Sequence, residues 1–513
     1  MARINSNVPS LIARANLSQA NSDLQTRLQR LSTGLRINRG ADDPAGLIIS
    51  ERLRSEISGL NTAVSNSNRA SSVIATTEGA LAEVSNLLSS IKGLIVEAAN
   101  TGAVSDDERK ANQVQIDSAI DSITRISNST SFAGLKLLNG SLDYTLSGVQ
   151  SSNLGKVAVT SANFSGAANL RVDVQTINSA QNANIFLSGS TGRFLSATRF
   201  TVGGVSGVQE IAIASGTTLS AVAAAVNTFK GATGVSASLI NASNQNSGLR
   251  FTSTGYGTKQ FVSVDRVNAP SSGNSFHTYK APDTFNLPGT ISLATLQAGG
   301  NLIATGRDKG RDVAAIINGN LATGDGLKIS LQNSSAVSVA IDLTKTFATT
   351  NNATSTFYIT GGGALYQLGG QVNTSQQTNI GIQSIAASKL GGTLINGSLN
   401  FLSSIKTGGG NDLLTSASRT SFLEASDVLE TSIDEVSTIR GRLGAFEKNT
   451  LQTNIRSLQS AVENLTASES VIRDADFAEE TSKLTRAQIL SSAATSVLSL
   501  SNQQSQQVLS LLK

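Results

Sequence analysis

The 513-residue chain contains no cysteine and no tryptophan, one histidine and five prolines. Without cysteine, disulfide bonds, thiolate nucleophiles and Cys-ligated zinc or iron–sulfur sites are excluded. The single histidine, His277, has no second histidine with which to form a zinc-binding motif. Aromatic residues make up only 4% of the chain, so its interior must consist of aliphatic side chains. We expect neither a metal site nor a catalytic residue.

Charge is also scarce. Only 14% of the residues are charged, the net charge is +4, and no run of lysine or arginine occurs. Nucleic-acid binding needs a concentrated basic face, usually with aromatic residues between the charges, so no nucleic-acid partner is expected. The first residues, MARINSNVPSLIARANLSQ, contain no continuous apolar stretch and no small-residue cleavage site. A conventional signal peptide is therefore not expected.

Glycine-rich stretches such as VGGVSGV and TGGGALYQLGG lack the GxxxxGK[ST] spacing of a phosphate loop. None of them opens a nucleotide-binding βαβ unit with its acidic partner residue, so turns in β-structure explain them better and no cofactor is expected. The glycines also divide the chain, because 37 of the 46 lie between residues 131 and 410. The two ends are predicted to be helical and the middle β-rich, which makes the fold class α+β.

The N-terminal arm shows the leucine spacing of a coiled coil, which is broken at GADDPAG and resumes after it. Gly40 can end the first helix, while Asp43 and Pro44 suit the N-cap and first position of a second helix over about 44–99. Asp42 and Asp43 could instead form a metal-binding or acid–base pair, but helix capping is the better explanation. The leucines predicted to pack in the core are Leu24, Leu28, Leu31 and Leu35.

Other helix starts carry capping signals. Ser105 and Glu108 have the spacing of a capping box, which predicts a helix to about residue 128 with Ile116, Ile120 and Ile123 inward. Ser421 with Glu424, and Asp476 with Glu479, predict two further helices in the C-terminal part. These helices match the N-terminal ones in character and are expected to pair with them.

The tail carries no charged residue between Arg486 and Lys513. A membrane span is rejected, because eight Ser, Asn and Gln residues fall in its middle, where hydrocarbon would leave them without partners. A helix on the outside of a bundle should have a charged face, and this one has none. We therefore expect it to be buried by intermolecular packing, although an intramolecular bundle is the simpler reading. Its predicted seam contains Leu490, Ala494, Val497, Ser501, Gln504, Val508 and Leu511.

In the middle, short alternating segments such as VSASLI and LRFTST predict strands. One helix, TTLSAVAAAVNTF, is predicted to be capped by Thr218. A strand–helix–strand order is expected over about 199–265, with a looser echo at 309–345.

Several segments resemble bacterial flagellin. They are LQRLSTGLRINRGADDPAGLIISERL, NRASSVIATTEGALAEVSNLL and TSFAGLKLLNG near the N-terminus, then IRGRLGAFEKNTLQ, RDADFAEETSKLTRAQIL and QQVLSLLK. They match at both ends and in the correct order. The central IAIASGTTLSAVAAAVNTFKGATGVSASL resembles an insert motif of flagellins and related hook proteins.

The resemblance implies an extracellular filament subunit for motility, exported unfolded through the flagellar type III system. Its implied partners are copies of itself, an export chaperone, the filament cap and the hook–filament junction proteins. Residues 1–42 with 472–513 would form an inner-core coiled coil. Residues 43–175 with 411–471 would form an outer-core rod with a β-hairpin, and 176–410 a variable β-rich surface region. A junction protein of the same family, and a filament-borne adhesin acting through 176–410, are the alternatives.

One departure from the family pattern concerns its vertebrate Toll-like receptor. Flagellins sensed by that receptor carry a basic residue at the place of Ser90 and an acidic residue at the place of Gln115, and only Leu94 is retained here. The resemblance therefore implies weak signalling through the receptor.

Overall fold

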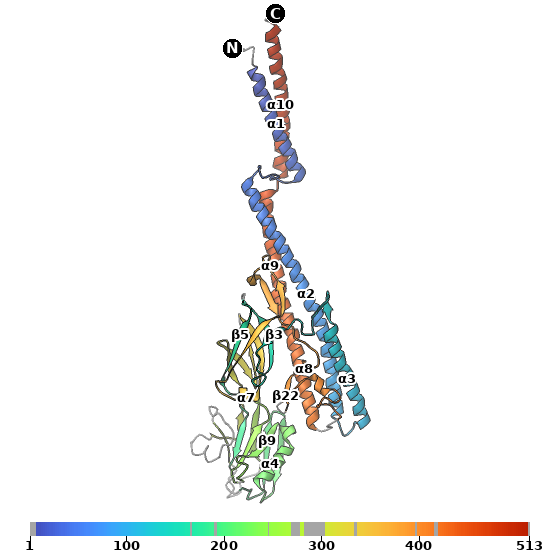
Figure 1. The fold of residues 1–513 in the computed structure, drawn as a ribbon, viewed down its shortest axis with the longest axis vertical. Helices are drawn as coiled ribbons and strands as arrows, with labels where there is room; N and C mark the ends of the chain where they lie inside the picture. The colour runs from blue at the N-terminus through green and yellow to red at the C-terminus, as the bar shows by residue number, and fades with distance from the viewer. Residues whose placement is uncertain are drawn as a thin grey trace. The chain divides into compact units, whose positions relative to one another are not determined.

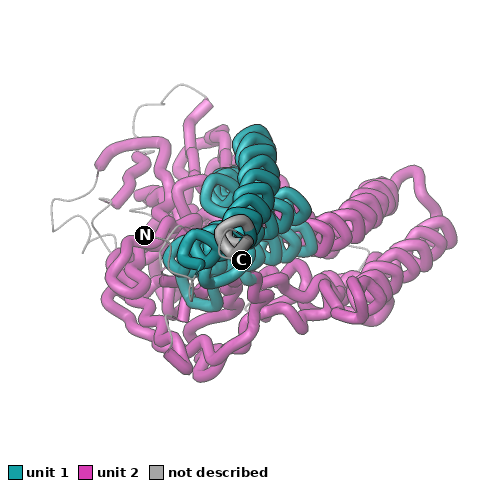
Figure 2. The backbone as a smooth tube through the Cα atoms, turned by 90° about the horizontal axis from the view of Figure 1, so that it is seen from above, with its two compact units in different colours: residues 1–70, 367–377, 448–513 teal, residues 71–366, 378–447 magenta. Residues whose placement is uncertain are grey.

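The computed structural model describes residues 7–510 apart from 165–166, 189–191, 245, 268–276, 282–302, 333–335, 396–397 and 415–418. The chain divides into two compact units, coloured separately in Figure 2. Unit 1 comprises residues 1–70, 367–377 and 448–513, and unit 2 comprises residues 71–366 and 378–447. The predicted α+β class, with long terminal helices that pair and a β-rich centre, is confirmed (Figure 1).

Unit 1 contains the pair formed by helices α1 (Val8–Thr33) and α10 (Phe477–Ser510), which run antiparallel beside one another (Figure 1). Asn7 caps α1, and Gly34 ends it in the left-handed conformation with φ of 72°. Asp476 caps α10, as predicted, by accepting hydrogen bonds from the amides of Ala478 and Glu479 at 2.8 and 3.1 Å. Unit 1 also holds α9 (Gln452–Arg473) and the first part of α2 (Pro44–Ala98).

Helix α2 has 55 residues, close to the predicted span. By length and apolar composition alone it could cross a membrane. That is weak evidence for a span, because core helices of soluble proteins pass the same test. In unit 2 its apolar face is buried in the protein, with Leu81, Val84, Leu88 and Ile91 fully covered.

The remainder of α2 lies in unit 2 with α3 (Asp106–Ser129) and α8 (Arg419–Phe446), which a π-helical turn, η3 (Glu447–Leu451), follows. The capping box at Ser105 and Glu108 is confirmed, and so is the burial of the three isoleucines of α3. The helix start predicted at Ser421 is wrong. The helix already begins at Arg419, and Ser421 is a buried residue of its first turn.

An eight-stranded antiparallel sheet forms the larger β-layer of unit 2. Its core is aliphatic apart from a few aromatic residues such as Phe347 and Phe357. The sheet takes strands from both sides of residue 175. Its strands, in spatial order, are β3 (Tyr144–Ser147), β19 (Thr354–Gly362), β5 (Leu170–Asn178), β15 (Ala314–Ile317), β16 (Asn320–Asp325), β17 (Lys328–Leu331), β18 (Val337–Leu343) and β4 (Leu154–Ala162).

Two further sheets share a second core with helix α4 (Leu219–Thr228), which Thr218 caps as predicted. Helix α5 (Lys230–Thr233) follows α4. The strand–helix–strand order over 199–265 is confirmed. One sheet has the order β13 (Ile303–Ala304), β12 (Thr278–Lys280), β6 (Asn184–Leu187), β10 (Leu249–Ser253), β9 (Val235–Leu239), and the other β14 (Arg307–Lys309), β11 (Phe261–Arg266), β7 (Thr198–Gly204), β8 (Gly207–Ile213).

The strand–helix–strand echo over 309–345 is wrong, because GRDVAAIINGN (310–320), which holds the place of the helix in that order, contains strand β15 instead. Burial alternates along Ala314–Ile317, and Asn318 and Gly319 then turn the chain with positive φ. The remaining elements are short: β1 (Ser131–Phe132) with β2 (Leu135–Lys136), β20 (Ala364–Gln367) with β21 (Gln377–Ile380), β22 (Thr393–Ile395) with β23 (Ser398–Asn400), α7 (Lys345–Ala348), η1 (Thr374–Gln376) and η2 (Leu402–Ile405).

Candidate assembly surface

The seam between α1 and α10 is narrow and largely made of small or polar side chains. Along α10 the more buried residues recur at alternating spacings of four and three, as in a coiled coil. Because half of these residues are alanine or serine, the two helices bury less apolar area against each other than an all-leucine seam would. The seam residues of α10 are Glu480, Leu484, Ala487, Ser491, Ala494, Leu498 and Ser501, and those of α1 are Ala13, Leu17, Ala20, Leu24 and Leu31.

A charged cluster lies at one end of this seam. The Glu480 carboxylate accepts hydrogen bonds from Arg27 at 3.1 and 3.2 Å and from Arg30 at 3.3 Å, and its side chain is 5% exposed. Burial alone would lower the pKa of Arg27, but its hydrogen bonds and charge attraction to Glu480 and Asp23 raise it. The buried carboxylate needs these partners, so the cluster selects one register of α1 against α10.

Polar contacts continue the same register toward the ends of the helices. Ser491 donates a hydrogen bond to Asn21 at 2.7 Å, and Ser10 donates one to Asn502 at 2.8 Å. Such bonds fix alignment more than they add stability, because the exposed groups could bond to water instead.

Large apolar side chains point away from the seam on both helices. On α10, Ile489 and Leu500 are each 63% exposed, and on α1 Leu11 and Ile12 are 59% and 57% exposed. The structure also exposes two residues of the predicted seam, Leu490 and Val497, by 48% and 56%, whereas Ala494 and Ser501 face α1. We call the exposed apolar set Leu11, Ile12, Ile489, Leu490, Val497 and Leu500 the outer stripe.

The other predicted core residues have mixed surroundings. Leu24 and Leu31 are half-buried, Leu28 is 48% exposed, and Leu35 forms an isolated β-bridge with Asp474 beyond the end of α1. The side chain of Val508 and all of Leu511 lie outside the described residues.

Asp42 and Asp43, which precede α2, accept hydrogen bonds from different parts of the chain. The Asp43 carboxylate accepts a hydrogen bond from the Gly46 amide at 2.9 Å, the contact of an N-cap residue, and Pro44 is the first residue of the helix. Asp42 instead accepts bonds from the amides of Arg39 and Asn38 at 2.8 and 2.9 Å, which lower the pKa of its carboxyl. The pair therefore stabilises a turn and a helix start.

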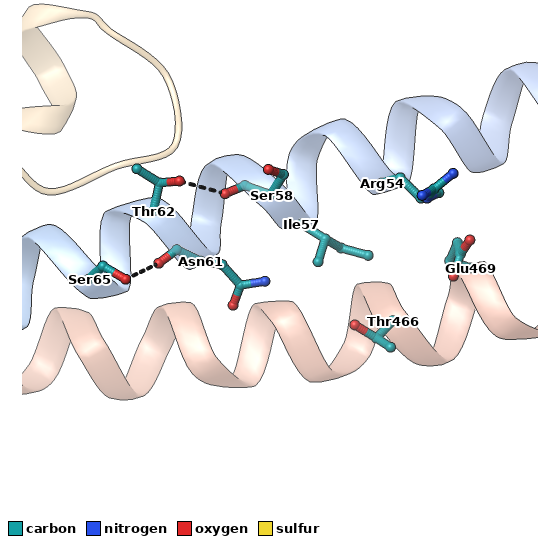
Figure 3. A pocket seen from close by; sticks show the side chains of 8 residues that line it. All are labelled: Arg54, Ile57, Ser58, Asn61, Thr62, Ser65, Thr466 and Glu469. Carbon is teal, nitrogen blue, oxygen red and sulfur yellow. Dashed lines mark hydrogen bonds between the residues drawn. The ribbon is translucent and has the colours of Figure 1, made fainter.

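Between α2 and α9, unit 1 has an open groove of about 490 Å³ (Figure 3). Its only charged lining residues are Arg54 and Glu469. The hydroxyls of Thr62 and Ser65 bond back to carbonyls of their own helix at 3.0 Å, so they do not converge on a ligand. A groove of this kind suits helix or loop packing better than catalysis.

Buried titratable groups in unit 2 have structural partners. Burial raises the pKa of Tyr144 to about 12, and its hydroxyl oxygen accepts a hydrogen bond from the Ala162 amide at 2.9 Å. Burial likewise raises the pKa of Asp143 and lowers that of Arg442, whose guanidinium donates to the Thr160 carbonyl at 3.2 Å. In the described part of the chain no three His, Cys, Asp or Glu residues gather as metal ligands would.

The positions that departed from the family pattern are on helices of unit 2. Ser90 on α2 and Gln115 on α3 are exposed, and Leu94 is half-buried.

The sequence-based reasoning missed Glu480 and the outer-stripe residues Leu11, Ile12, Ile489 and Leu500. Their signal was present: when Leu484 and Leu498 take position a of a heptad, Ile489 and Leu500 take the outward positions f and c.

Three family models match the chain. The bacterial flagellin N-terminal helical region matches residues 4–143, the bacterial flagellin C-terminal helical region matches 426–512, and the flagellin hook IN motif matches 199–255. The last of these covers β7 except its first residue, and all of β8, α4, α5, β9 and β10.

Curated relatives match the chain end to end. The flagellin of Salmonella rubislaw is 31% identical over 522 residues, and the B-type flagellin of Pseudomonas aeruginosa is 29% identical over 524 residues, each covering 99% of both chains. Among solved structures, a flagellar hook-associated protein 3 from Legionella pneumophila has a TM-score of 0.30 at 12% identity, over 82% of this chain and 97% of that one. A likeness at this level does not bear on function.

Proposed function

This chain belongs to the bacterial flagellin family, and from that relationship we propose that the outer stripe of the α1–α10 pair is the surface through which its copies join in the filament. Flagellins are structural proteins that form the flagellar filament and serve motility, and this chain is such a subunit.

The observation that carries the proposal is the contrast between the two faces of α10. The face toward α1 carries only two large apolar residues, Leu484 and Leu498, among small and polar ones, whereas the stripe on other faces holds four that are 48–63% exposed. Fully burying each such side chain is worth about 1.5–3 kcal/mol. Neighbouring copies of the same chain are the partners that a homopolymer supplies, so assembly would cover what folding leaves exposed.

The predicted core residues enter this proposal in two groups. Leu24, Leu31 and Ala494 would hold the pair together, while Leu28, Leu490, Val497, Val508 and Leu511 would contact neighbouring copies.

We infer the domain division from the family: an inner core from residues 1–42 and 472–513, an outer rod from 43–175 and 411–471, and a surface region from 176–410. One sheet of unit 2 takes strands from both sides of residue 175, so the proposed boundary there would mark a place in the filament and not an edge between folded units.

Export and assembly partners complete the proposal. We infer that the chain passes unfolded through the type III system with an export chaperone, and that it meets cap and junction proteins at the filament ends. The α1–α10 pair suits this route, because helices that share so small an apolar seam cost little to separate. The filament places the protein outside the cell.

Seeded polymerisation tests the surface. The double variant Val497→Ser, Leu500→Ser should raise the critical monomer concentration at least about tenfold, since each lost apolar contact weakens subunit association by more than 1 kcal/mol. Val372→Ser is the matched control, because Val372 is 87% exposed in unit 1 but lies outside the helix pair. Electron microscopy of a chain lacking residues 487–513 gives the extreme case, in which no tubes are expected.

Wild-type critical concentration in the double variant, with the control also unchanged, would overturn the proposed surface. Tubes from the truncated chain would show that the tail is not needed for assembly. If the full chain itself formed only short rings under seeding, the junction-protein alternative would replace the filament role.

A further inference from the structure

Two Asn-Gly dipeptides lie in the described part of the chain, at Asn139–Gly140 and Asn318–Gly319. Asparagine before glycine is prone to spontaneous deamidation, because no side chain hinders the glycine nitrogen as it approaches the asparagine carboxamide. Both asparagines are exposed. They differ in how their carboxamides are held, so one structure supplies both a reactive candidate and its control.

Asn139 is held loosely. It lies in the loop between β2 and β3, and its side-chain oxygen accepts one hydrogen bond, from the Ser141 amide at 3.0 Å. Among the described residues, no protein group accepts a hydrogen bond from its side-chain nitrogen or from the Gly140 amide. The attacking nitrogen and the departing amide are therefore both unengaged by the protein.

Asn318 is held firmly. It sits with φ of 47° in the turn between β15 and β16. Its side-chain oxygen accepts a hydrogen bond from the Asp173 amide at 2.8 Å, and its side-chain nitrogen donates to the Arg171 carbonyl at 3.0 Å. Both partners are on β5, the next strand of the sheet, so the carboxamide cannot turn without breaking two bonds.

We propose that Asn139 is a site of spontaneous covalent modification, in which Asn139–Gly140 converts to aspartyl and isoaspartyl forms while Asn318–Gly319 is protected. The Gly140 nitrogen forms a bond to Cγ of Asn139 and loses its proton to solvent. The bond from Cγ to the side-chain nitrogen breaks, and ammonia leaves. Water then opens the cyclic imide at either carbonyl, giving aspartate or isoaspartate.

The isoaspartyl product matters structurally, because it inserts a methylene into the backbone directly after two buried residues. Leu137 and Leu138 are fully buried, and the Leu138 carbonyl accepts hydrogen bonds from Ser127 at 2.6 Å and Ile385 at 3.1 Å. Shifting the chain at residue 139 disturbs this junction of α3 with the segment around Ile385. The aspartyl product keeps the oxygen that faces Ser141, so the turn survives in that form.

The test is peptide mapping by mass spectrometry of the purified full chain during incubation in mildly alkaline buffer. Asn139 should deamidate about two- to twelvefold faster than Asn318, the ratio expected from one additional hydrogen bond at the slower site. In denaturing urea the two rates should converge, because both sites then lose their folded surroundings. Isoaspartyl methyltransferase labelling reports the second product independently.

Asn139→Gln is the matched variant, because a glutamine side chain forms the cyclic intermediate far less readily while keeping the amide. It should abolish labelling of the peptide that contains residue 139 and leave the Asn318 signal unchanged. Equal rates at the two sites in the folded protein, or faster reaction at Asn318, would overturn the proposal. So would a rate difference that persists in urea, since it would then come from sequence alone.

Discussion

Gly391 lets its loop pack closely against helix α8 in unit 2, because it has no side chain. Its φ is 80°, and a Cβ there would meet Ser432 Oγ and lie 2.8 Å from the Val428 carbonyl oxygen, both on α8. The Gly391 amide also donates to Glu435 of the same helix at 3.0 Å. Only glycine permits this approach.

Gly391→Ala should therefore destabilise unit 2 by about 2 kcal/mol or more, from left-handed strain plus the clash. The control is Gly441→Ala, at a helical position where a Cβ meets nothing within 4 Å. That change should be neutral or stabilise by up to about 1 kcal/mol. Calorimetric unfolding distinguishes the two, and equal effects would contradict the close approach.

Asp342 provides a pH prediction. Burial raises the pKa of its carboxyl despite Lys328, whose Nζ lies 3.6 Å away, and despite Lys156 opposite it on β4. Because the folded-state pKa lies above the ordinary value of 3.8, folding favours the protonated form, and this contribution is lost as the pH rises through the folded-state pKa. Asp342→Asn should raise the melting temperature modestly at pH 7, with the gain shrinking as the pH approaches 4. A gain that is constant with pH would contradict the account.

Ser90 and Gln115 allow a functional prediction at the same scale. The family resemblance implies that charged residues at these positions bind the Toll-like receptor, and charge-assisted hydrogen bonds are about twice as strong as neutral ones. The monomer should signal weakly in reporter cells, and Ser90→Arg with Gln115→Glu should raise the response. Potent signalling by the unmodified monomer would show that other contacts suffice.

Among the secondary-structure elements, the register of α1 against α10 can be measured directly because the chain has no cysteine of its own. Asn21→Cys with Ser491→Cys replaces a hydrogen-bonded pair, so oxidation should cross-link the helices. Adding Glu480→Ala should lower the yield several-fold, since Arg27 and Arg30 then lose their shared partner. Lys483→Ala, which removes only an exposed contact with Glu479, should not. A yield unaffected by Glu480→Ala would mean that the apolar residues alone set the register.

Element boundaries were predictable where a local signal decides them. Ser105, Thr218 and Asp476 cap helices that begin where their sequence spacing predicts, because capping involves only the next three residues. The start predicted at Ser421 failed because the helix already begins at Arg419, which places Ser421 within its first turn. The segment GRDVAAIINGN does not form a helix. Its apolar run fits the period of a helix or of a strand, and pairing with β5 stabilises the strand.

For the molecule as a whole, the helical ends and β-rich centre could be inferred from the glycine distribution and the leucine spacing. The sharing of one sheet by residues before and after 175 could not, since no local pattern encodes which distant strands pair. For the candidate surface, the uncharged tail predicts that α10 needs partners beyond α1, and this stays a prediction; the structure shows that several large apolar residues of α10 are exposed. The face of α10 that meets α1 could not be predicted. It carries Glu480, and a lone acidic residue in a helix does not tell which face of the helix is buried.

The antiparallel pairing of α1 with α10 also determines when the pair can form during synthesis of the chain. Helix α10 is translated long after α1, so a copy that ends before residue 477 cannot form the pair. Contacts this distant in sequence form late and slowly. Such a copy keeps Leu11 and Ile12 but lacks the outer-stripe residues of α10 as well as the seam, so most of the proposed joining surface is missing. Since the outer stripe is the proposed joining surface, we expect the α1–α10 pair to keep such shortened copies out of the polymer.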